Sequence, residues 1–396
     1  MRRRNTPGNN AKILLIAVVF TQLMTLSGCE MPIPVSTEIT NTEEKEEGLL
    51  PERQSEQKTE ETEQAVSESA GNYAYQTLNS EEQAVYDEIY TAMQKQMEKV
   101  AVDTLDTAVL DHAFRAVSAD YGGMFWVSGY VYTQYTKGEK LVGLDFAPKY
   151  TMSFQMRCEK QREIDEAVRE ILAGISPDAS DYEKAKYVYD YLAMHVDYEI
   201  NAADNQNIIS VFLNRKTVCQ GYANATQYLL DCLSIQSAVV TGTADGEPHA
   251  WNLVLLDGEY YMMDSTWGNS TYDSGQQGVK KFVNYNYFAV TTEEISRTHT
   301  ADEEIRLPEC TATADNYYQR EGKYVSEWNP QAIGEIYKQG YDTGAGTASV
   351  KFATQELYQQ AKSYFIDEQH ITDYCNGITA LSYLEDTNQN VLILNY

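Results

Sequence analysis

Apolar residues recur at intervals of three and four between residues 217 and 233, which is the spacing of one face of an α-helix. This stripe predicts a helix that buries one side against a sheet. Thr217 and Gln220 have the spacing of a capping box, in which two side chains bind free backbone amides of the first turn. We therefore expect a helix that starts at Thr217 and holds Cys219 in its first turn. The stripe consists of Tyr222, Ala225, Leu229 and Leu233.

Two strand-like runs, residues 250–256 and 259–263, are separated by Asp257 and Gly258. An Asp-Gly pair between two such runs is a strong signal for a two-residue β-hairpin. The pattern therefore predicts an antiparallel pair of strands shortly after the helix.

Counting outward from this turn predicts which residues face each other across the hairpin. His249 is expected opposite Thr266, and Asp264 opposite Trp251. The period of two then puts His249 and Asp264 on the same face as diagonal neighbours, so their side chains can meet. A slip of one residue would place them on opposite faces.

Elsewhere the pattern predicts an N-terminal α/β region at 73–175, a core at 176–308 and a small C-terminal α/β domain at 309–396. The first has a helix at Ser80 capped by Gln83, and a strand-rich stretch from Phe125 to Phe146. The fold class is therefore α+β. In the last region we expect helices at 330–338 and 354–365 and strands at 348–352, 378–383 and 391–395.

The first residues are typical of an export signal, because basic residues precede a short apolar run at 13–26. Leu26 to Cys29 resembles the lipobox of bacterial lipoproteins, in which the cysteine is lipidated. A plain signal peptide or an uncleaved anchor is the alternative. We expect a signal peptide at 1–28 and an acidic disordered linker at 29–72, whose residues cannot form an apolar core. The chain should then lie outside the cytoplasm, anchored to the bacterial cell membrane through Cys29.

Charge and motif content limit the partners and cofactors that we expect for this chain. The formal net charge of −29 opposes binding to nucleic acid, although it can serve solubility alone. No P-loop or dinucleotide motif is present, so no cofactor is expected. The histidines other than His249, including His299, are dispersed without metal-ligand spacing, which predicts no metal. By default we expect free thiols at the remaining cysteines, Cys158, Cys232, Cys310 and Cys375.

Cys219, His249 and Asp264 together have the residue types of a thiol acyl-transfer site. The positive end of a helix favours the thiolate at Cys219. A carboxylate on one imidazole nitrogen of His249 fixes the tautomer and leaves the other nitrogen free to accept the thiol proton. Each residue alone has an ordinary structural explanation; the three together predict catalysis.

The motifs around these residues resemble those of the bacterial transglutaminase-like superfamily, over residues 180 to 300. They are Val218 to Ala223, Pro248 to Asn252 and Tyr261 to Gly268. This resemblance implies a papain-like core in which a helix carrying Cys219 packs on an antiparallel sheet carrying His249 and Asp264. It also implies an oxyanion site made by the backbone amide of Cys219 and, as a guess, Tyr198. Trp251 and Trp267 either pack in the core or line a substrate groove.

The expected function is a surface-anchored thiol enzyme that acts on amide or peptide bonds through a cysteine thioester. Protein, peptide and peptidoglycan are the substrates considered, and water or an amine can resolve the thioester. The alternative is a catalytically idle transglutaminase-like module that binds peptide or cell-wall glycan. A further alternative is a structural surface lipoprotein whose C-terminal region makes the contacts.

Overall fold

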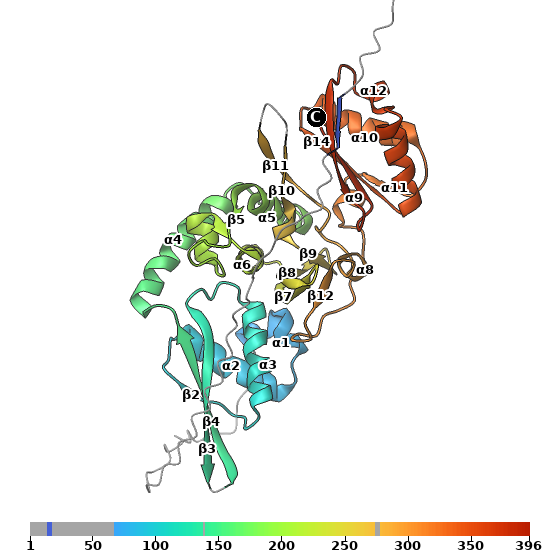
Figure 1. The fold of residues 1–396 in the computed structure, drawn as a ribbon. Helices are drawn as coiled ribbons and strands as arrows, with labels where there is room; N and C mark the ends of the chain where they lie inside the picture. Colours follow the sequence, from blue (N-terminus) through green and yellow to red (C-terminus); the bar gives the residue numbers. More distant parts are fainter. Residues whose placement is uncertain (1–13, 18–66, 138, 274–277) are drawn as a thin grey trace, which may run out of the picture.

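The computed structural model describes residues 14–17, 67–137, 139–273 and 278–396 (Figure 1). Helices and sheets of two to five strands are mixed along this part of the chain, which confirms a mixed α and β fold. Cys29 and most of the predicted linker lie outside the described residues. Regular structure is already present within the last residues of the predicted linker, where the side chain of Ser67 caps a 3-10 helix, η1 (Glu68–Gly71).

The N-terminal region combines helices with a long β-hairpin. The hairpin lies in the predicted strand-rich stretch. The cap of α2 differs from the prediction: Asn79 and Glu82, not Ser80 and Gln83, form the capping box. An asparagine one position earlier binds the amides of the first turn, so the helix starts at Ser80. The elements are α1 (Tyr73–Thr77), α2 (Ser80–Gln94), β2 (Val100–Ala101), α3 (Thr107–Asp120), β3 (Val127–Lys137), β4 (Lys140–Tyr150) and α4 (Phe154–Leu172).

The central region contains a four-stranded antiparallel sheet in the order β12-β7-β8-β9. Helix α6 packs on β7 and β8. The first elements are α5 (Asp181–His195), β5 (Asp197–Tyr198), the π-helix η2 (Ser210–Asn214), β6 (Lys216–Thr217), α6 (Cys219–Cys232), β7 (Ser237–Ala244), β8 (Glu247–Leu256) and β9 (Glu259–Met263). They are followed by α7 (Ser265–Gly268), β10 (Asn269–Asp273), β11 (Val279–Val283), α8 (Thr292–Ile295) and β12 (His299–Ala301).

The two faces of this sheet are buried by different parts of the chain. Val254 and Leu256 of β8 join an apolar cluster with α5 and α6. Leu253 and Trp251, which alternate with them, join a second cluster with α2 and α3 of the N-terminal region. The N-terminal region therefore shares its core with the sheet. This arrangement fixes α3 beside the strands that carry the candidate site.

The C-terminal region contains a five-stranded sheet in the order β1-β15-β16-β14-β13 and its own apolar cluster. Its helices and strands agree with the predicted pattern. Strand β1, within the predicted export signal, pairs in parallel with β15. The elements are β1 (Leu14–Ala17), α9 (Tyr317–Arg320), β13 (Tyr324–Val325), α10 (Pro330–Asp342), β14 (Thr347–Phe352), α11 (Gln355–Lys362), η4 (Ser363–Asp367), α12 (Ile371–Tyr374), β15 (Ala380–Asp386) and β16 (Val391–Asn395).

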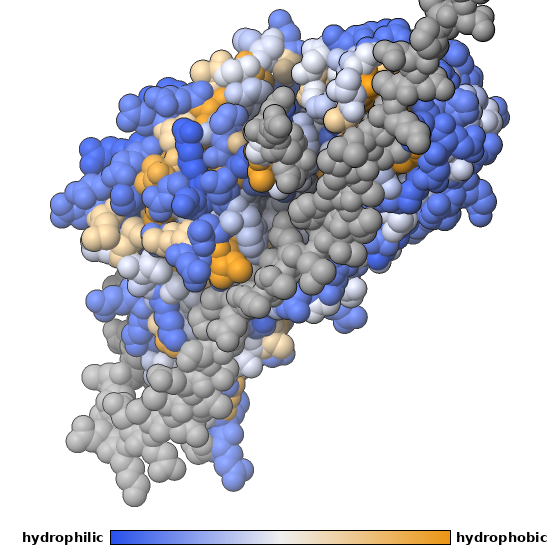
Figure 2. All heavy atoms as spheres, turned by 45° about the horizontal axis from the view of Figure 1, so that its top comes forward, coloured by the Kyte–Doolittle hydropathy of each residue, from blue (hydrophilic) through white to orange (hydrophobic). Residues whose placement is uncertain are grey.

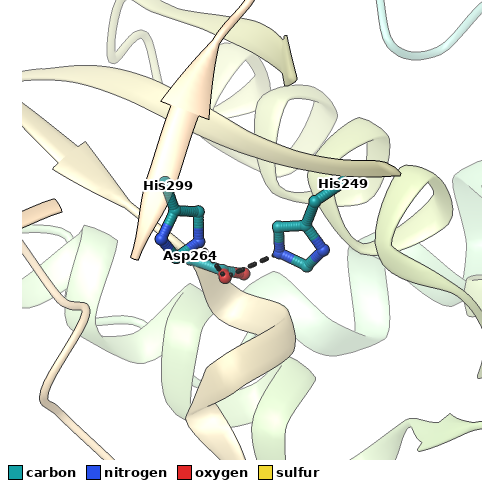
Figure 3. Close-up of side chains that lie close together, drawn as sticks. All are labelled: His249, Asp264 and His299. Atoms are coloured by element: carbon teal, nitrogen blue, oxygen red, sulfur yellow. Dashed lines mark hydrogen bonds and ion pairs between the residues drawn. The ribbon is translucent and has the colours of Figure 1, made fainter. Parts of the chain in front are cut away.

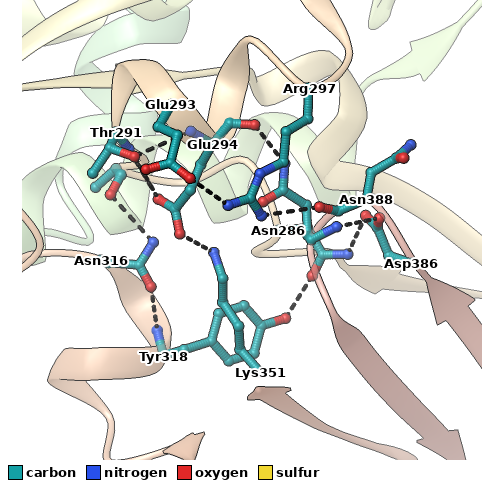
Figure 4. A network of polar contacts seen from close by, with 12 residues as sticks. Asn286, Thr291, Glu293, Glu294, Arg297, Asn316, Tyr318, Lys351, Asp386 and Asn388 are labelled. Carbon is teal, nitrogen blue, oxygen red and sulfur yellow. Dashed lines mark hydrogen bonds and ion pairs between the residues drawn. The ribbon is translucent and has the colours of Figure 1, made fainter. Parts of the chain in front are cut away.

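A polar network joins this region to the central one (Figure 4). Lys351 of β14 forms an ion pair with Glu294 of α8, and the side chain of Asn286 donates to Asp386 at 2.7 Å. Burial raises the pKa of Glu294, but the adjacent Lys351 outweighs it and holds the net pKa below its ordinary value. The network therefore fixes the C-terminal region beside α8 through charged and polar contacts.

Hydrophilic residues predominate on the face seen in Figure 2, and hydrophobic residues gather there in small spots. This agrees with the acidic composition of the chain. Within the described ranges, no helix combines the length and apolar character needed to cross a membrane.

Candidate active site

Cys219 is the first residue of α6 and is 1% exposed. The chain reaches it through β6, which pairs in parallel with β5. Val218 is still extended and forms the N-cap, and no side-chain hydrogen bond from the N-cap closes the first turn. Cys219 therefore lies where the amides and the dipole of the helix favour a thiolate, as predicted.

The predicted capping box of Thr217 and Gln220 is wrong. The hydroxyl of Thr217 donates to the carbonyl of Asn205 and accepts from the hydroxyl of Ser210, both at 2.7 Å. The pairing of β5 with β6 keeps Thr217 in the strand, so the N-cap of α6 is Val218, one residue after the predicted Thr217, and the helix begins at Cys219. A Cβ at Gly221 would lie 1.9 Å from the Thr217 hydroxyl, so glycine makes room for this strand.

The predicted hairpin of β8 and β9 is confirmed, but its ladder is shorter than expected. Pairing ends at Met263. The predicted pairs of Asp264 with Trp251 and of Thr266 with His249 therefore do not form. The chain instead turns into α7 directly after Asp264, because the Asp264 side chain caps that helix.

Asp264 uses its two oxygens for different tasks. Its Oδ1 accepts from the backbone amides of Thr266 and Trp267 at 2.9 and 3.4 Å. Its Oδ2 lies 2.8 Å from Nε2 of His249 (Figure 3). The helix cap orients the carboxylate. The predicted contact between His249 and Asp264 is present, although the β8–β9 ladder ends before it reaches either residue.

The surroundings of Asp264 keep its carboxyl group ionised, which in turn favours one tautomer of His249. Asp264 is fully buried, and burial alone would raise its pKa; attraction to His249 and hydrogen bonds from His249 and His299 outweigh it and hold the pKa well below its usual range. An ionised carboxylate at Nε2 favours the proton on that nitrogen. Nδ1 of His249 is buried without a hydrogen-bond partner among the described residues. It is therefore placed to accept a proton.

His299 is part of the site, although no role in the site was predicted for it. Its Nε2 lies 3.2 Å from the same Oδ2 of Asp264 (Figure 3). Its Nδ1 lies 2.8 Å from the hydroxyl of Thr298. Strand β12 brings it there by pairing His299 with Ala244 of β7. The description of His299 as dispersed is therefore wrong. The pairing of His299 with Ala244, 55 residues earlier in the chain, reveals its place.

His249, Asp264 and His299 are also the residues that can hold a metal ion, since one ligand atom from each lies within 4.8 Å of the others. Two histidines and a carboxylate suit zinc or another divalent transition metal. Both Nε2 atoms are, however, hydrogen-bonded to Asp264 Oδ2. A metal would have to replace these protons, whereas the hydrogen-bonded arrangement satisfies the carboxylate as it stands.

The two predicted tryptophans surround the histidine pair. The ring centroids of Trp251 and Trp267 lie 6.2 and 5.9 Å from that of His249, and the same rings lie 5.0 and 4.6 Å from His299. Trp251 is 2% and Trp267 is 6% exposed. Their placement is that of core packing, one of the two predicted roles, and it shields the two histidines and the Asp264 carboxylate from solvent.

Tyr198, the guessed oxyanion residue, lies in β5 and packs against the small apolar cluster of Val218 and Cys219. The pairing of β5 with β6 puts Tyr198 opposite Thr217, two residues before Cys219. The structure thus brings this side chain to the first turn of α6.

Replacing His299 by phenylalanine should lower the free energy of unfolding at pH 7 by about 1.5–3 kcal/mol, the contribution of a hydrogen bond to a charged group. Asp264 has a folded-state pKa below its unfolded value, so its contribution is present above about pH 4 and is lost as the pH falls through the lowered value. The difference between the two proteins should therefore shrink on acidification. Urea unfolding at several pH values measures it; a difference independent of pH would indicate packing alone.

Comparison with known proteins finds one family model that spans the three candidate catalytic residues. The family model of the Transglutaminase-like superfamily matches residues 166–265, a stretch that includes Cys219, His249 and Asp264. Kyphoscoliosis peptidase of Mus musculus is 24% identical over 143 residues, and that of Homo sapiens is 26% identical over 142 residues. The match covers 32% of this chain and about a fifth of either relative, 22% and 21%.

Solved structures of similar proteins include a TGase, with a TM-score of 0.26 and 16% identity over 38% of this chain and 47% of the other. The periplasmic domain of TgpA from Pseudomonas aeruginosa has a TM-score of 0.21 and 15% identity over 33% of this chain and 55% of the other. The match to the Transglutaminase-like superfamily model covers about a quarter of this chain. His299 lies beyond the matched residues.

Proposed function

We propose that this chain is a thiol enzyme that acts on amide or peptide bonds, with Cys219 as nucleophile, His249 as general base and Asp264 as the residue that orients His249. The observation that carries the proposal is the buried pair of His249 and Asp264, 2.8 Å apart, whose second imidazole nitrogen has no partner among the described residues. A histidine that a buried carboxylate orients, with its other nitrogen available, has the arrangement of a general base.

The packing of α6 supports the place of Cys219 in this site. Ala223, one turn after Cys219, lies in an apolar cluster with Ala250, the residue that follows His249. The side chain of Asn252 donates to the carbonyl of Ala223 at 3.0 Å. These contacts hold the first turns of α6 against the strand that carries His249.

The proposed reaction has two stages. Nδ1 of His249 takes the thiol proton, and the sulfur of Cys219 attacks the carbonyl carbon to give a tetrahedral oxyanion. The backbone amide of Cys219 and Tyr198 are the proposed donors to that oxygen. When the carbon–nitrogen bond breaks, the leaving amine takes the proton from His249. The resulting thioester is then attacked by water or by a second amine, which loses its proton to His249. The carbon–sulfur bond then breaks, the acid or the new amide leaves, and the sulfur of Cys219 takes the proton back from His249.

The acceptor decides between hydrolysis and transfer. Water wins where it reaches the thioester freely, and an amine wins only where the site holds it and excludes solvent. We propose peptide or protein amides, including peptidoglycan peptides, as substrates, at the outer surface of a bacterial membrane where lipidated Cys29 would hold the chain.

Product analysis tests this function. The full chain is incubated with a mixture of peptide and cell-wall amides in ¹⁸O-labelled water containing a labelled primary amine, and mass spectrometry identifies the products. We expect ¹⁸O or the amine to appear at a carbonyl carbon, and neither in a Cys219→Ser variant. Ligand binding with no product in either protein would instead support the idle binding module.

A further inference from the structure

A cavity of about 240 Å³ lies between the N-terminal region and the first turns of α6, and we name it the α3–α6 pocket. One side of it is formed by α3, the segment after it and the start of β3. The other side is formed by Gln220 and Asn224 of α6 and by Gln206 and Asn207 of the preceding loop. Gln220 directly follows Cys219, so the pocket adjoins the turn that carries the candidate nucleophile.

The two sides of the pocket differ in chemistry. The N-terminal side includes the buried apolar residues Met93, Phe114 and Phe125, which are 1%, 3% and 2% exposed, together with the hydroxyl groups of Ser118, Ser128 and Thr151. The α6 side is lined by amide side chains, of which Gln220 donates to Asn224 at 3.0 Å and Asn224 donates to the carbonyl of Gln206 at 3.1 Å. Amide groups of this kind can hydrogen-bond both donors and acceptors of a peptide backbone. No charged side chain lines the pocket, although the chain carries a formal charge of −29. The pocket therefore suits an uncharged apolar group that is attached to a peptide.

The pocket is held in place by contacts that cross between the two regions. The backbone amide of Gly122 donates to the side chain of Gln227 at 2.9 Å, and that side chain donates to the carbonyl of Asp120 at 2.6 Å. A Cβ at Gly122 would lie 2.7 Å from the carbonyl oxygen of Asn224, so the two backbones touch here. The pocket is thus preformed at a fixed distance from the start of α6. Exposed Ser128 and Thr151 line it and leave it open to solvent.

Its size limits the occupant. A volume of about 240 Å³ is below the roughly 300–1,000 Å³ of sites for drug-sized molecules, and suits one large side chain. We propose that the α3–α6 pocket binds an apolar, uncharged side chain of a peptide substrate next to the amide that Cys219 attacks. This inference rests on the proposed function and narrows its substrate to peptides with a residue such as leucine, methionine or phenylalanine near the reacting bond.

The test compares peptidyl chloromethyl ketones that differ in one side chain, leucine, glycine, aspartate or lysine, at each of the first three positions. Mass spectrometry measures the rate at which each labels Cys219 in the full chain. At one position the leucine reagent should react about tenfold faster than the others, as expected from burying one such side chain. Equal rates for all four side chains at every position would overturn the proposal.

Two variants of Ser118 in α3 test whether the α3–α6 pocket causes the preference for the leucine reagent. Ser118 lines the pocket and is half-buried. Ser118→Leu fills the pocket and should remove the preference for leucine, whereas Ser118→Ala, the matched control, should keep it within twofold. A preference that survives Ser118→Leu would place the specificity elsewhere and contradict the proposal.

Two further measurements separate this inference from the proposed function. Iodoacetamide is too small to need the pocket, so its rate at Cys219 reports only the activation of the thiol and should be equal in all three proteins. In Cys219→Ala, binding of a leucine-containing peptide amide is followed by calorimetry and should weaken about tenfold with Ser118→Leu. Unchanged binding would overturn the pocket, even if the thiol is inert towards every reagent.

Discussion

Replacing Cys219 by alanine is expected to lower amide turnover about 10³-fold or more, because the variant cannot form the thioester. The residual rate would come from binding and from donors to the oxyanion alone. Turnover is measured with the amide substrate found by product analysis, at saturating concentration. The stability of the fold should change little, since one small buried side chain replaces another.

Cys310 supplies the matched control for this substitution. It is 2% exposed, close to the 1% of Cys219, and burial raises its pKa to about 11. Cys310→Ala removes a buried thiol outside the site and should leave turnover within about twofold. Equal losses in the two variants would show that the effect of Cys219→Ala is structural.

The second large effect is expected for Asp264→Asn, which should lower turnover by about 10³- to 10⁴-fold. The asparagine keeps the shape but can present an amide N–H to His249, which then adopts the other tautomer and has no lone pair on Nδ1. Because Oδ1 caps α7 and Oδ2 receives both histidines, Asp264→Ala should in addition cost about 3–5 kcal/mol of unfolding free energy.

The comparison of these two variants separates catalysis from folding. Asp264→Asn retains one oxygen for the cap and should unfold at a denaturant concentration between those of the wild type and Asp264→Ala. Its turnover should nevertheless be almost as low as that of Cys219→Ala. Turnover that instead follows stability across the three proteins would refute the role assigned to Asp264.

Local signals in the sequence predicted the elements that position the site. The apolar stripe of α6 and the Asp-Gly turn between β8 and β9 depend on neighbouring residues, and both elements are present. The placement of Cys219 in the first turn was predicted from a Thr217 cap that does not form, and it is nevertheless correct because the N-cap moves by only one residue, to Val218. The apolar stripe correctly predicts that a helix follows, whereas it does not define the residue at which the helix starts.

Long-range pairing decided what the sequence could not reveal. Thr217 lies in a strand because it pairs with Tyr198 of β5, 19 residues earlier in the chain. His299 lies in the site because β12 pairs with β7. The end of the β8–β9 ladder depends on whether Asp264 continues the strand or caps a helix, and both options suit an aspartate. The α3–α6 pocket likewise depends on the packing of two regions that no local pattern brings together.

The central claim is that His249 activates Cys219. The most direct measurement is the pH dependence of iodoacetamide alkylation at each cysteine, in the wild type and in His249→Ala. Cys219 should react at pH 6–7 faster than exposed Cys158 and buried Cys310, and His249→Ala should move its profile to the ordinary thiol range near pH 8.5. Since Cys219 is less accessible than Cys158, access cannot explain such a result. A profile of Cys219 that is unchanged by His249→Ala would contradict the account.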